Sequence, residues 1–346
     1  MTPNSPPETT IIGPLDQLAR PLRDLRVSVT DRCNFRCPYC MPAEVFGERY
    51  EFLPKPEILT FEEITRTAAA FVALGTRKIR ITGGEPLLRA QLPILIADLA
   101  RIPNLDDLSL TTNGFLLGAV ARELADAGLR RVTVSLDSLD PNIFARMSGG
   151  IREPSIVLDA IDAAERAGLA PVKINCVVQR GVNEPDIVAL ARHFRGTGHI
   201  VRYIEYMDVG TRNQWSDDAV VSEREIIEKI AAEFPLEVIP PNYEGEVARR
   251  YRYLDGAGEI GVIASVTRPF CGGCTRARLT TEGQLVTCLF AERGVDLKAS
   301  LRDGTNDEAL RARIAAIWTG RNDRYSELRG KGQPAARRIE MYQVGG

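Results

Sequence analysis

Short apolar runs alternate with longer amphipathic segments along most of the chain. Six runs rich in Val, Ile and Thr are typical of strands buried on both faces: Leu25–Thr30, Lys78–Thr82, Leu105–Thr111, Arg131–Leu136, Val172–Val178 and Ile200–Tyr206. Helical periodicity predicts helices between them at Leu92–Arg101, Leu116–Ala127, Ser155–Ala167 and Asp186–Phe194. Two capping boxes predict further helices, one from Thr60 to about Leu74 and one from Ser222 through Phe234.

This strict alternation predicts an α/β fold, with a parallel sheet covered by helices on its outer side. Six strand–helix units are too few to close an eightfold TIM barrel, so we expect an open, partial (βα)6 barrel. Functional residues of such folds gather at the carboxyl ends of the strands. The unusual segments of this chain follow strands in that way: Asp31–Cys40, Gly83–Pro86, Thr111–Gly114 and Ser135–Ser138.

The pattern changes near Pro235–Pro241, which divides the predicted chain into three parts. Residues 1–20 are Pro-rich and predict a mobile tail, residues 21–240 the barrel, and residues 241–346 a smaller C-terminal region. Within that region we expect a hairpin at Thr280–Gln284 and a helix near Asp307–Trp318.

Composition narrows the function classes. The 346 residues carry a net charge of −2 and the sequence pI is about 5.9, so no overall basic field favours a nucleic-acid partner. No apolar run approaches the ~20 residues of a membrane-spanning helix, and the N-terminus lacks the pattern of a secretory signal. We therefore expect a cytoplasmic protein without a membrane partner, in a compartment where cysteines seldom form disulfides.

Six of the seven cysteines form two triplets without a fourth member. The first is C-x3-C-x2-C (Cys33, Cys37, Cys40), and the second is C-x2-C-x13-C (Cys271, Cys274, Cys288). A structural zinc site takes four protein ligands, and an iron–sulfur cubane usually takes four thiolates. Three thiolates leave one position open for another molecule, although half of a zinc site is the alternative. Cys176, inside a predicted strand, is interpreted as a small buried apolar residue.

The first triplet, with Tyr39 before its last cysteine, resembles the loop of the radical S-adenosylmethionine superfamily. Gly83-Gly-Glu-Pro86, after the second predicted strand, resembles the second element of that superfamily. The second triplet, the run from Asp24 to Cys33 and the terminal Gly345-Gly346 together resemble the molybdenum-cofactor biosynthesis protein A family, whose members are GTP 3′,8-cyclases. The resemblance covers about Leu22 to Gly346, and implies a barrel of the radical S-adenosylmethionine type with a second iron–sulfur cluster in the C-terminal region.

The resemblance implies a role for individual residues. Two [4Fe–4S] clusters would be held by Cys33, Cys37 and Cys40 and by Cys271, Cys274 and Cys288. The backbone of four residues would line the S-adenosylmethionine site: Tyr39, Gly84, Ser135 and Met207. GTP would be bound by Arg26, Arg80, Thr111, Lys173, Arg276, Ala277 and Arg278, with Lys78 and Arg202 as further candidates. The residues expected to assist catalysis are Arg26, Lys173, Arg276 and Arg278.

Elementary chemistry supports the basic residues independently. Arginine binds phosphate through paired hydrogen bonds, and lysine acts as a point charge. Arg276 and Arg278 are two residues apart, as are Lys78 and Arg80, so on strands each pair shares a face. The alternative for such residues is a solvated surface position, and for Lys173 a place at the barrel rim.

The implied reaction belongs to a lyase. A 5′-deoxyadenosyl radical would remove the ribose C3′ hydrogen of GTP, and the C3′ radical would bond to guanine C8. The product would be (8S)-3′,8-cyclo-7,8-dihydroguanosine 5′-triphosphate. The implied partners are an external electron donor and, transiently, the next enzyme, cyclic pyranopterin monophosphate synthase, with a homodimer as one possible assembly. The two glycines at the C-terminus would enter the active site.

Two other functions remain open from the sequence. A peptide-modifying radical enzyme would carry a comparable extra cluster, but it would need a peptide groove in place of a group of arginines. A non-enzymatic electron carrier would need fully ligated clusters.

Overall fold

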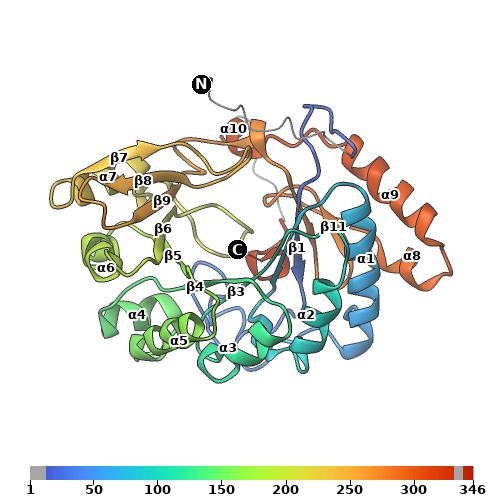
Figure 1. Cartoon of the computed structure of the whole chain (residues 1–346), viewed down its shortest axis with the longest axis horizontal. Helices are drawn as coiled ribbons and strands as arrows, with labels where there is room; N and C mark the ends of the chain where they lie inside the picture. Colours follow the sequence, from blue (N-terminus) through green and yellow to red (C-terminus); the bar gives the residue numbers. More distant parts are fainter. Residues whose placement is uncertain (1–12, 331–337, 346) are drawn as a thin grey trace, which may run out of the picture.

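A computed structural model describes residues 13–330 and 338–345 of the chain. Its centre is a run of six parallel strands in sequence order: β1 (Asp24–Ser28), β2 (Lys78–Thr82), β3 (Asp107–Thr112), β4 (Arg131–Ser135), β5 (Lys173–Val178) and β6 (Ile200–Glu205). All six predicted strands are therefore confirmed, with ends that differ by at most two residues. The strands curve into an open barrel whose interior is visible in Figure 1.

Helices cover the outer side of the sheet (Figure 1). They are α1 (Phe61–Ala73), α2 (Leu92–Ala100), α3 (Leu117–Asp126), α4 (Pro141–Ser148), α5 (Pro154–Arg166), α6 (Ile187–Phe194) and α7 (Glu223–Ala231). The capping boxes of α1 and α7 are both formed, with Thr60 and Ser222 accepting hydrogen bonds from the backbone three residues later. The expected end of α7 at Phe234 was wrong by three residues, and α4 was not predicted.

The C-terminal half of the chain extends both sides of the same sheet. It adds β7 (Leu236–Ile239), β8 (Arg249–Tyr253), β9 (Glu259–Ile263), β10 (Arg276–Leu279), β11 (Gln284–Val286) and β12 (Val295–Asp296). β9 pairs in parallel with β6, and β10 pairs in parallel with β1. The sheet thus has the order β12-β11-β10-β1-β2-β3-β4-β5-β6-β9-β8-β7. The hairpin predicted at Thr280–Gln284 is the antiparallel turn between β10 and β11.

Four helices follow the last strands: α8 (Lys298–Arg302), α9 (Asp307–Thr319), α10 (Tyr325–Leu328) and α11 (Met341–Val344). α9 is the helix predicted near Asp307–Trp318. In Figure 1, α11 lies inside the ring of strands, where it contacts β1. The division of the chain at residue 240 remains a prediction.

The N-terminal segment was expected to be a mobile tail as far as residue 20. Residues 1–12 lie outside the described part of the chain. Beyond them, Asp16 and Arg20 are buried and form an ion pair of 2.6 Å, and Arg321 lies 3.0 Å from the same carboxylate. These charges fix residues 16–20 against the segment that follows α9.

Alternating apolar residues of the strands pack against the helices and form one continuous core. Val27, Ile79 and Ile81 are completely buried, as is Cys176, which agrees with its interpretation as a small apolar residue. Within the described residues, no helix is both long enough and apolar enough to cross a lipid bilayer.

Candidate active site

The interior of the barrel holds one large cavity, and both cysteine triplets line it. None of these six cysteines is in a disulfide. The first triplet follows the carboxyl end of β1, whereas Cys271 and Cys274 precede β10, which runs parallel to β1 with Asp24 opposite Arg276. The two triplets therefore lie at opposite ends of the barrel and face a shared space.

The loop of the first triplet is held by its own backbone and by one arginine. Cys40 donates its amide to the carbonyl of Cys37 at 3.0 Å. Arg36 donates to the carbonyl oxygens of Cys33 and Phe46, both at 2.7 Å. Burial raises the pKa of the Cys33 thiol to about 11 and also raises that of Cys37 and Cys40. Buried thiols of this kind need a metal to become thiolates.

The Gly83–Pro86 segment packs directly on that loop. A Cβ atom at Gly84 would lie 2.3 Å from the carbonyl oxygen of Arg32, so only glycine permits this approach. Glu85 is completely buried and accepts hydrogen bonds from the Thr112 hydroxyl at 2.8 Å and the Asn113 amide at 2.7 Å. Burial raises the pKa of Glu85 to about 7 despite these bonds. The motif therefore joins the loops that follow the first three strands.

Two buried arginines support the loop of the second triplet. Arg20 donates to the carbonyl oxygen of Cys271 at 2.7 Å, and Arg321 donates to that of Cys274 at 2.8 Å. Burial opposes ionisation of Cys274, but Arg276 and Arg321 outweigh it and lower the pKa of this thiol to about 6. Arg276 also donates to the sulfur of Cys274 at 3.1 Å.

The residues at both triplets fit iron–sulfur clusters. Within residues 13–330 and 338–345, no group of three or more His, Cys, Asp or Glu side chains is placed to hold a metal ion by itself. A cluster does not need such convergence, because each thiolate binds a different iron. Three free cysteines lining one cavity are a donor set that an iron–sulfur cluster could use.

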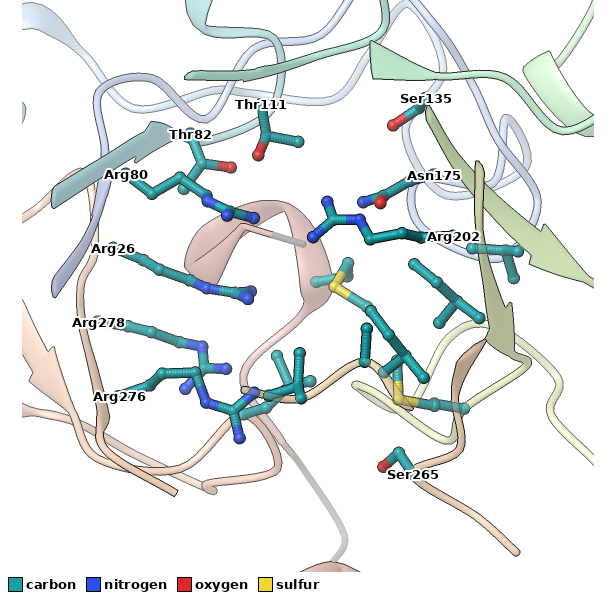
Figure 2. Close-up of a pocket in the computed structure, with 18 of the residues that line it drawn as sticks. Arg26, Arg80, Thr82, Thr111, Ser135, Asn175, Arg202, Ser265, Arg276 and Arg278 are labelled. Carbon is teal, nitrogen blue, oxygen red and sulfur yellow. The ribbon is translucent and has the colours of Figure 1, made fainter. Parts of the chain in front are cut away.

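Five arginines point into the cavity between the triplets (Figure 2). Arg80, Arg26 and Arg278 occupy one row across β2, β1 and β10, and Arg276 lies beside them; Arg202, on β6, approaches from the opposite wall. Burial lowers the pKa of Arg26 and Arg80, that of Arg202 to about 9 and that of Arg278 to about 10. Neighbouring arginines lower these pKa values further. The negative charge of a bound polyanion would oppose this lowering, because it favours the charged guanidinium groups.

Several of these guanidinium groups lack a partner. Among the described atoms, Nε of Arg202, Nε of Arg276, and Nε and Nη1 of Arg278 are buried without a hydrogen bond. Buried donors of this kind are costly unless a ligand accepts from them. Their number and charge indicate a ligand with several phosphate oxygens.

Of the other residues predicted to bind substrate, three line the cavity and one lies in the core. Thr111, Lys78 and Lys173 line the cavity, and burial with the positive charge of Arg202 lowers the pKa of Lys173 to about 7. Ala277 is completely buried and packs in the core, because alternate residues of β10 face opposite sides. Only the backbone of Ala277 remains available to a ligand.

The residues predicted to bind S-adenosylmethionine all line the cavity: Tyr39, Gly84, Ser135 and Met207. The Tyr39 hydroxyl donates to Asp137 at 2.7 Å, and Asp137 also accepts from the amide of Val177 at 2.8 Å. Asp137 and Asn175, which also line the cavity, were not predicted. Asn175 follows Lys173 by two residues on one strand face, a signal that the sequence did contain.

The C-terminal residues reach the same cavity. The Tyr342 hydroxyl lies 2.8 Å from that of Tyr50, and the Tyr342 ring packs on Phe46 in the loop of the first triplet. Arg26 donates to the carbonyl oxygen of Gly345 at 3.4 Å. Gly346, the second glycine of the predicted tail, lies outside the described residues.

Family models match two consecutive parts of the chain. Residues 27–194 match the radical SAM superfamily, and residues 199–327 match Molybdenum Cofactor Synthesis C. Proteins named GTP 3′,8-cyclase are similar over 96% of the chain: 53% identical in Acidothermus cellulolyticus, 51% in Xanthomonas axonopodis and 45% in Staphylococcus haemolyticus, each over 98% of the relative.

Solved structures show the same fold at much lower identity. Streptococcus suis SuiB bound to S-adenosylmethionine superposes with a TM-score of 0.61 and 14% identity. The match covers 90% of this chain and 68% of that protein.

Proposed function

The chain belongs to the GTP 3′,8-cyclase family of radical S-adenosylmethionine enzymes, and on that premise we propose how its residues divide the work of forming the C3′–C8 bond. The observation that carries the proposal is the convergence of two open cysteine triplets and five arginines on one cavity. That combination suits a reaction of molybdenum cofactor biosynthesis that starts from a nucleoside triphosphate.

The carboxyl end of the barrel is the proposed site of radical formation. Cys33, Cys37 and Cys40 would hold a [4Fe–4S] cluster, which with S-adenosylmethionine supplies a 5′-deoxyadenosyl radical that removes the C3′ hydrogen of GTP. The backbone of Gly84 and Ser135 would orient the sulfonium compound there. The walls around these residues exclude water, which protects a reactive intermediate.

The arginine row is the proposed triphosphate site. Arg26, Arg276 and Arg278 are adjacent on β1 and β10, and Arg276 and Arg278 have buried donors without partners. A bound triphosphate would satisfy those donors and offset the repulsion among the guanidinium groups. Lys173, Arg80, Thr111 and Arg202 would complete the site, and a fixed triphosphate would hold the ribose at a defined distance from the radical source.

The second triplet is the proposed site of a second [4Fe–4S] cluster whose open iron meets the guanine. Its support is the position of Cys271, Cys274 and Cys288 at the far end of the cavity from the first triplet. A base held at that end would keep C8 in place beside C3′ while the bond forms. An external electron donor and transient contact with the enzyme that consumes the product complete the proposal.

A labelling experiment tests the proposed function. The protein is reconstituted anaerobically with iron and sulfide, reduced, and supplied with S-adenosylmethionine and GTP that carries deuterium at C3′. We expect one deuterium in 5′-deoxyadenosine for each cyclised product, measured by mass spectrometry. Deoxyadenosine without deuterium would exclude C3′ as the site of hydrogen removal, and GTP deuterated at C2′ serves as the control.

A further inference from the structure

A second cavity opens at the amino-terminal end of the barrel, on the far side of the strands from the first triplet. The residues that line it include the first residue of five successive strands: Asp24, Lys78, Asp107, Arg131 and Lys173. Because parallel strands begin at one end of a barrel, this cavity lies where they start, not at the carboxyl ends where such folds usually bind ligands.

The second cavity adjoins the central one. Asp24, Lys78, Lys173 and Tyr243 line both, so these four side chains form the partition between them. Lys78 donates to the Tyr243 hydroxyl at 3.1 Å, and its ammonium lies 5.1 Å from the centre of the Tyr243 ring. Movement of the side chains that line both cavities would therefore connect them.

The β7–β8 segment (residues 240–248) carries Tyr243 across this end of the barrel. Gly245 anchors the segment on the loop of the second triplet, since a Cβ atom there would lie 2.8 Å from the carbonyl oxygen of Gly273. Tyr243, two residues earlier, stays 41% exposed. The amide of Glu246 also donates to the carbonyl oxygen of Tyr243 at 3.2 Å, and Arg250 donates to that of Pro240 at 2.9 Å. The backbone of the segment is thus held in place, while the Tyr243 hydroxyl accepts its hydrogen bond from Lys78.

The mouth of this second cavity is basic. Arg23, Arg77 and Arg130 line it, and none of them forms an ion pair within the described part of the chain. Arg77 and Arg130 donate only to carbonyl oxygens, those of Asn104 at 2.8 Å and Asp106 at 3.2 Å. Three acids also line this cavity: Asp107 is half-buried and pairs with Arg131 and Lys78, Asp24 accepts from the Thr275 hydroxyl, and Asp106 is exposed. Positive charge at a concave mouth raises the local concentration of anions.

We propose that this amino-terminal mouth is a basic passage through which the nucleotide triphosphate enters and leaves the central cavity when Tyr243 moves aside. The inference rests on the proposed function, because it takes GTP as the molecule that must reach the arginine row. Arg77 and Arg130 would attract the polyphosphate, and Lys78 and Lys173 would receive it from Tyr243. The mouth would serve passage and would not contact the bound substrate.

The kinetics of binding distinguish a passage from a binding site. A charge that acts only on passage changes the association and dissociation rate constants by the same factor and leaves Kd nearly unchanged. We expect the double variant Arg77→Glu, Arg130→Glu to slow both rate constants about tenfold at low salt, with the difference shrinking as salt is raised. Tyr243→Ala should accelerate both. The probe is 2-aminopurine riboside triphosphate in anaerobic stopped-flow measurements, with GTP as competitor.

The control is Arg224→Glu, which makes the same change of charge at an exposed position. Arg224 lies near the carboxyl end of β6, because the amide of the preceding residue, Glu223, donates to Glu205 there. If the double variant folds poorly, the single variant Arg130→Glu, at an exposed residue, replaces it. It should slow both rate constants by a smaller factor. Unchanged rate constants would overturn the proposal and place access elsewhere. A raised Kd from faster dissociation alone would also overturn it, since the arginines would then contact bound nucleotide. Loss of cyclisation in the unaltered enzyme would instead refute the proposed function.

Discussion

At the scale of single residues, the site is dominated by buried positive charge without enough partners. Arg26, Arg80 and Arg278 lie side by side, and burial lowers the pKa of each. Bringing like charges together inside a protein destabilises the unliganded state. A bound polyanion would offset this repulsion, so substrate binding should raise the free energy of unfolding.

Arg278 gives the most direct test of the arginine row. Arg278→Ala should reduce cyclisation roughly a hundredfold, because a buried donor set aimed at the triphosphate is lost. Iron content should stay that of the unaltered protein, since Arg278 is not a ligand. Product formation by liquid chromatography and iron per chain are the measurements. Arg278→Lys keeps the charge without the paired donors, so its cyclisation activity should lie between those of Arg278→Ala and the unaltered protein. A loss of iron in either variant would show that Arg278 has a structural role.

Lys173 predicts a proton linkage. Its pKa is lowered to about 7 in the folded protein, from 10.5, because burial and Arg202 disfavour the charged form. In the absence of nucleotide the folded state binds fewer protons than the unfolded state between about pH 7 and 10.5, so Lys173 makes stability rise with pH in that window. A bound triphosphate favours the charged form, so GTP binding at pH 8 should take up a proton.

Calorimetric titrations of GTP in two buffers of different ionisation enthalpy measure this uptake. At pH 6, where Lys173 is already charged, the uptake should shrink. Lys173→Gln should remove part of it at pH 8, leaving the contribution of Lys78, whose pKa burial lowers to about 8. Equal uptake in the variant and the unaltered protein would contradict the assignment.

At the scale of elements, buried polar side chains join the ends of strands in addition to the backbone hydrogen bonds between them. Glu205, the last residue of β6, is completely buried and accepts from the amides of Glu223, Val266 and Thr267, each at 2.9 Å. One carboxylate thereby connects β6, the start of α7 and the segment after β9. The Glu85 carboxylate likewise connects the loop after β2 to Thr112 and Asn113 at the end of β3, and the Glu85 amide donates to the carbonyl oxygen of Arg32 in the loop after β1.

Glu205→Gln should destabilise the fold by about 2–3 kcal/mol, because the amide group offers fewer acceptor sites and adds donors among buried donors. The midpoint of thermal unfolding should fall accordingly. The matched control is Glu228→Gln, at an exposed position of α7, which should change the midpoint of thermal unfolding little. An unaltered midpoint in Glu205→Gln would mean that the joined elements are held by apolar packing alone.

At the scale of the whole molecule, distant parts of the chain close the barrel around the cavity. β10 lies beside β1, α11 lies inside the ring of strands, and the β7–β8 segment crosses the amino-terminal end. Asp16, near the start of the described chain, pairs with Arg20 and Arg321, and these two arginines hold the loop of the second triplet. The chain termini therefore take part in building the site.

Asp16→Asn should selectively weaken the second cluster. Loss of the carboxylate leaves the buried Arg20 without an ion-pair partner and Arg321 with Asp323 alone, at a cost of about 3–5 kcal/mol, and loosens the backbone that positions Cys271 and Cys274. Iron per chain should fall by about half, while cleavage of S-adenosylmethionine at the first triplet persists. Asp98→Asn, which alters an exposed ion pair on α2, should keep all the iron. Equal loss of iron from both triplets would show a general defect in folding.

The sequence by itself determined most of the elements and the two cysteine triplets. Strand and helix periodicity, capping boxes and cysteine spacing are local patterns, so six strands, most of the helices and both triplets followed from them. Local patterns also led to errors. The helix α4 was missed, and so was Asp137, because a single polar residue after a strand resembles an ordinary turn residue. Asn175 was missed although it shares a strand face with Lys173.

Only the tertiary structure decided how these parts meet. The pairing of β10 with β1 places Arg278 beside Arg26 and turns Ala277 into the core, and it sets the two triplets at opposite ends of one cavity. The four residues of β10 do not by themselves specify pairing with β1, which lies far away in the sequence. That choice comes from the summed burial and hydrogen bonding of the closed sheet, which no single segment of the sequence carries.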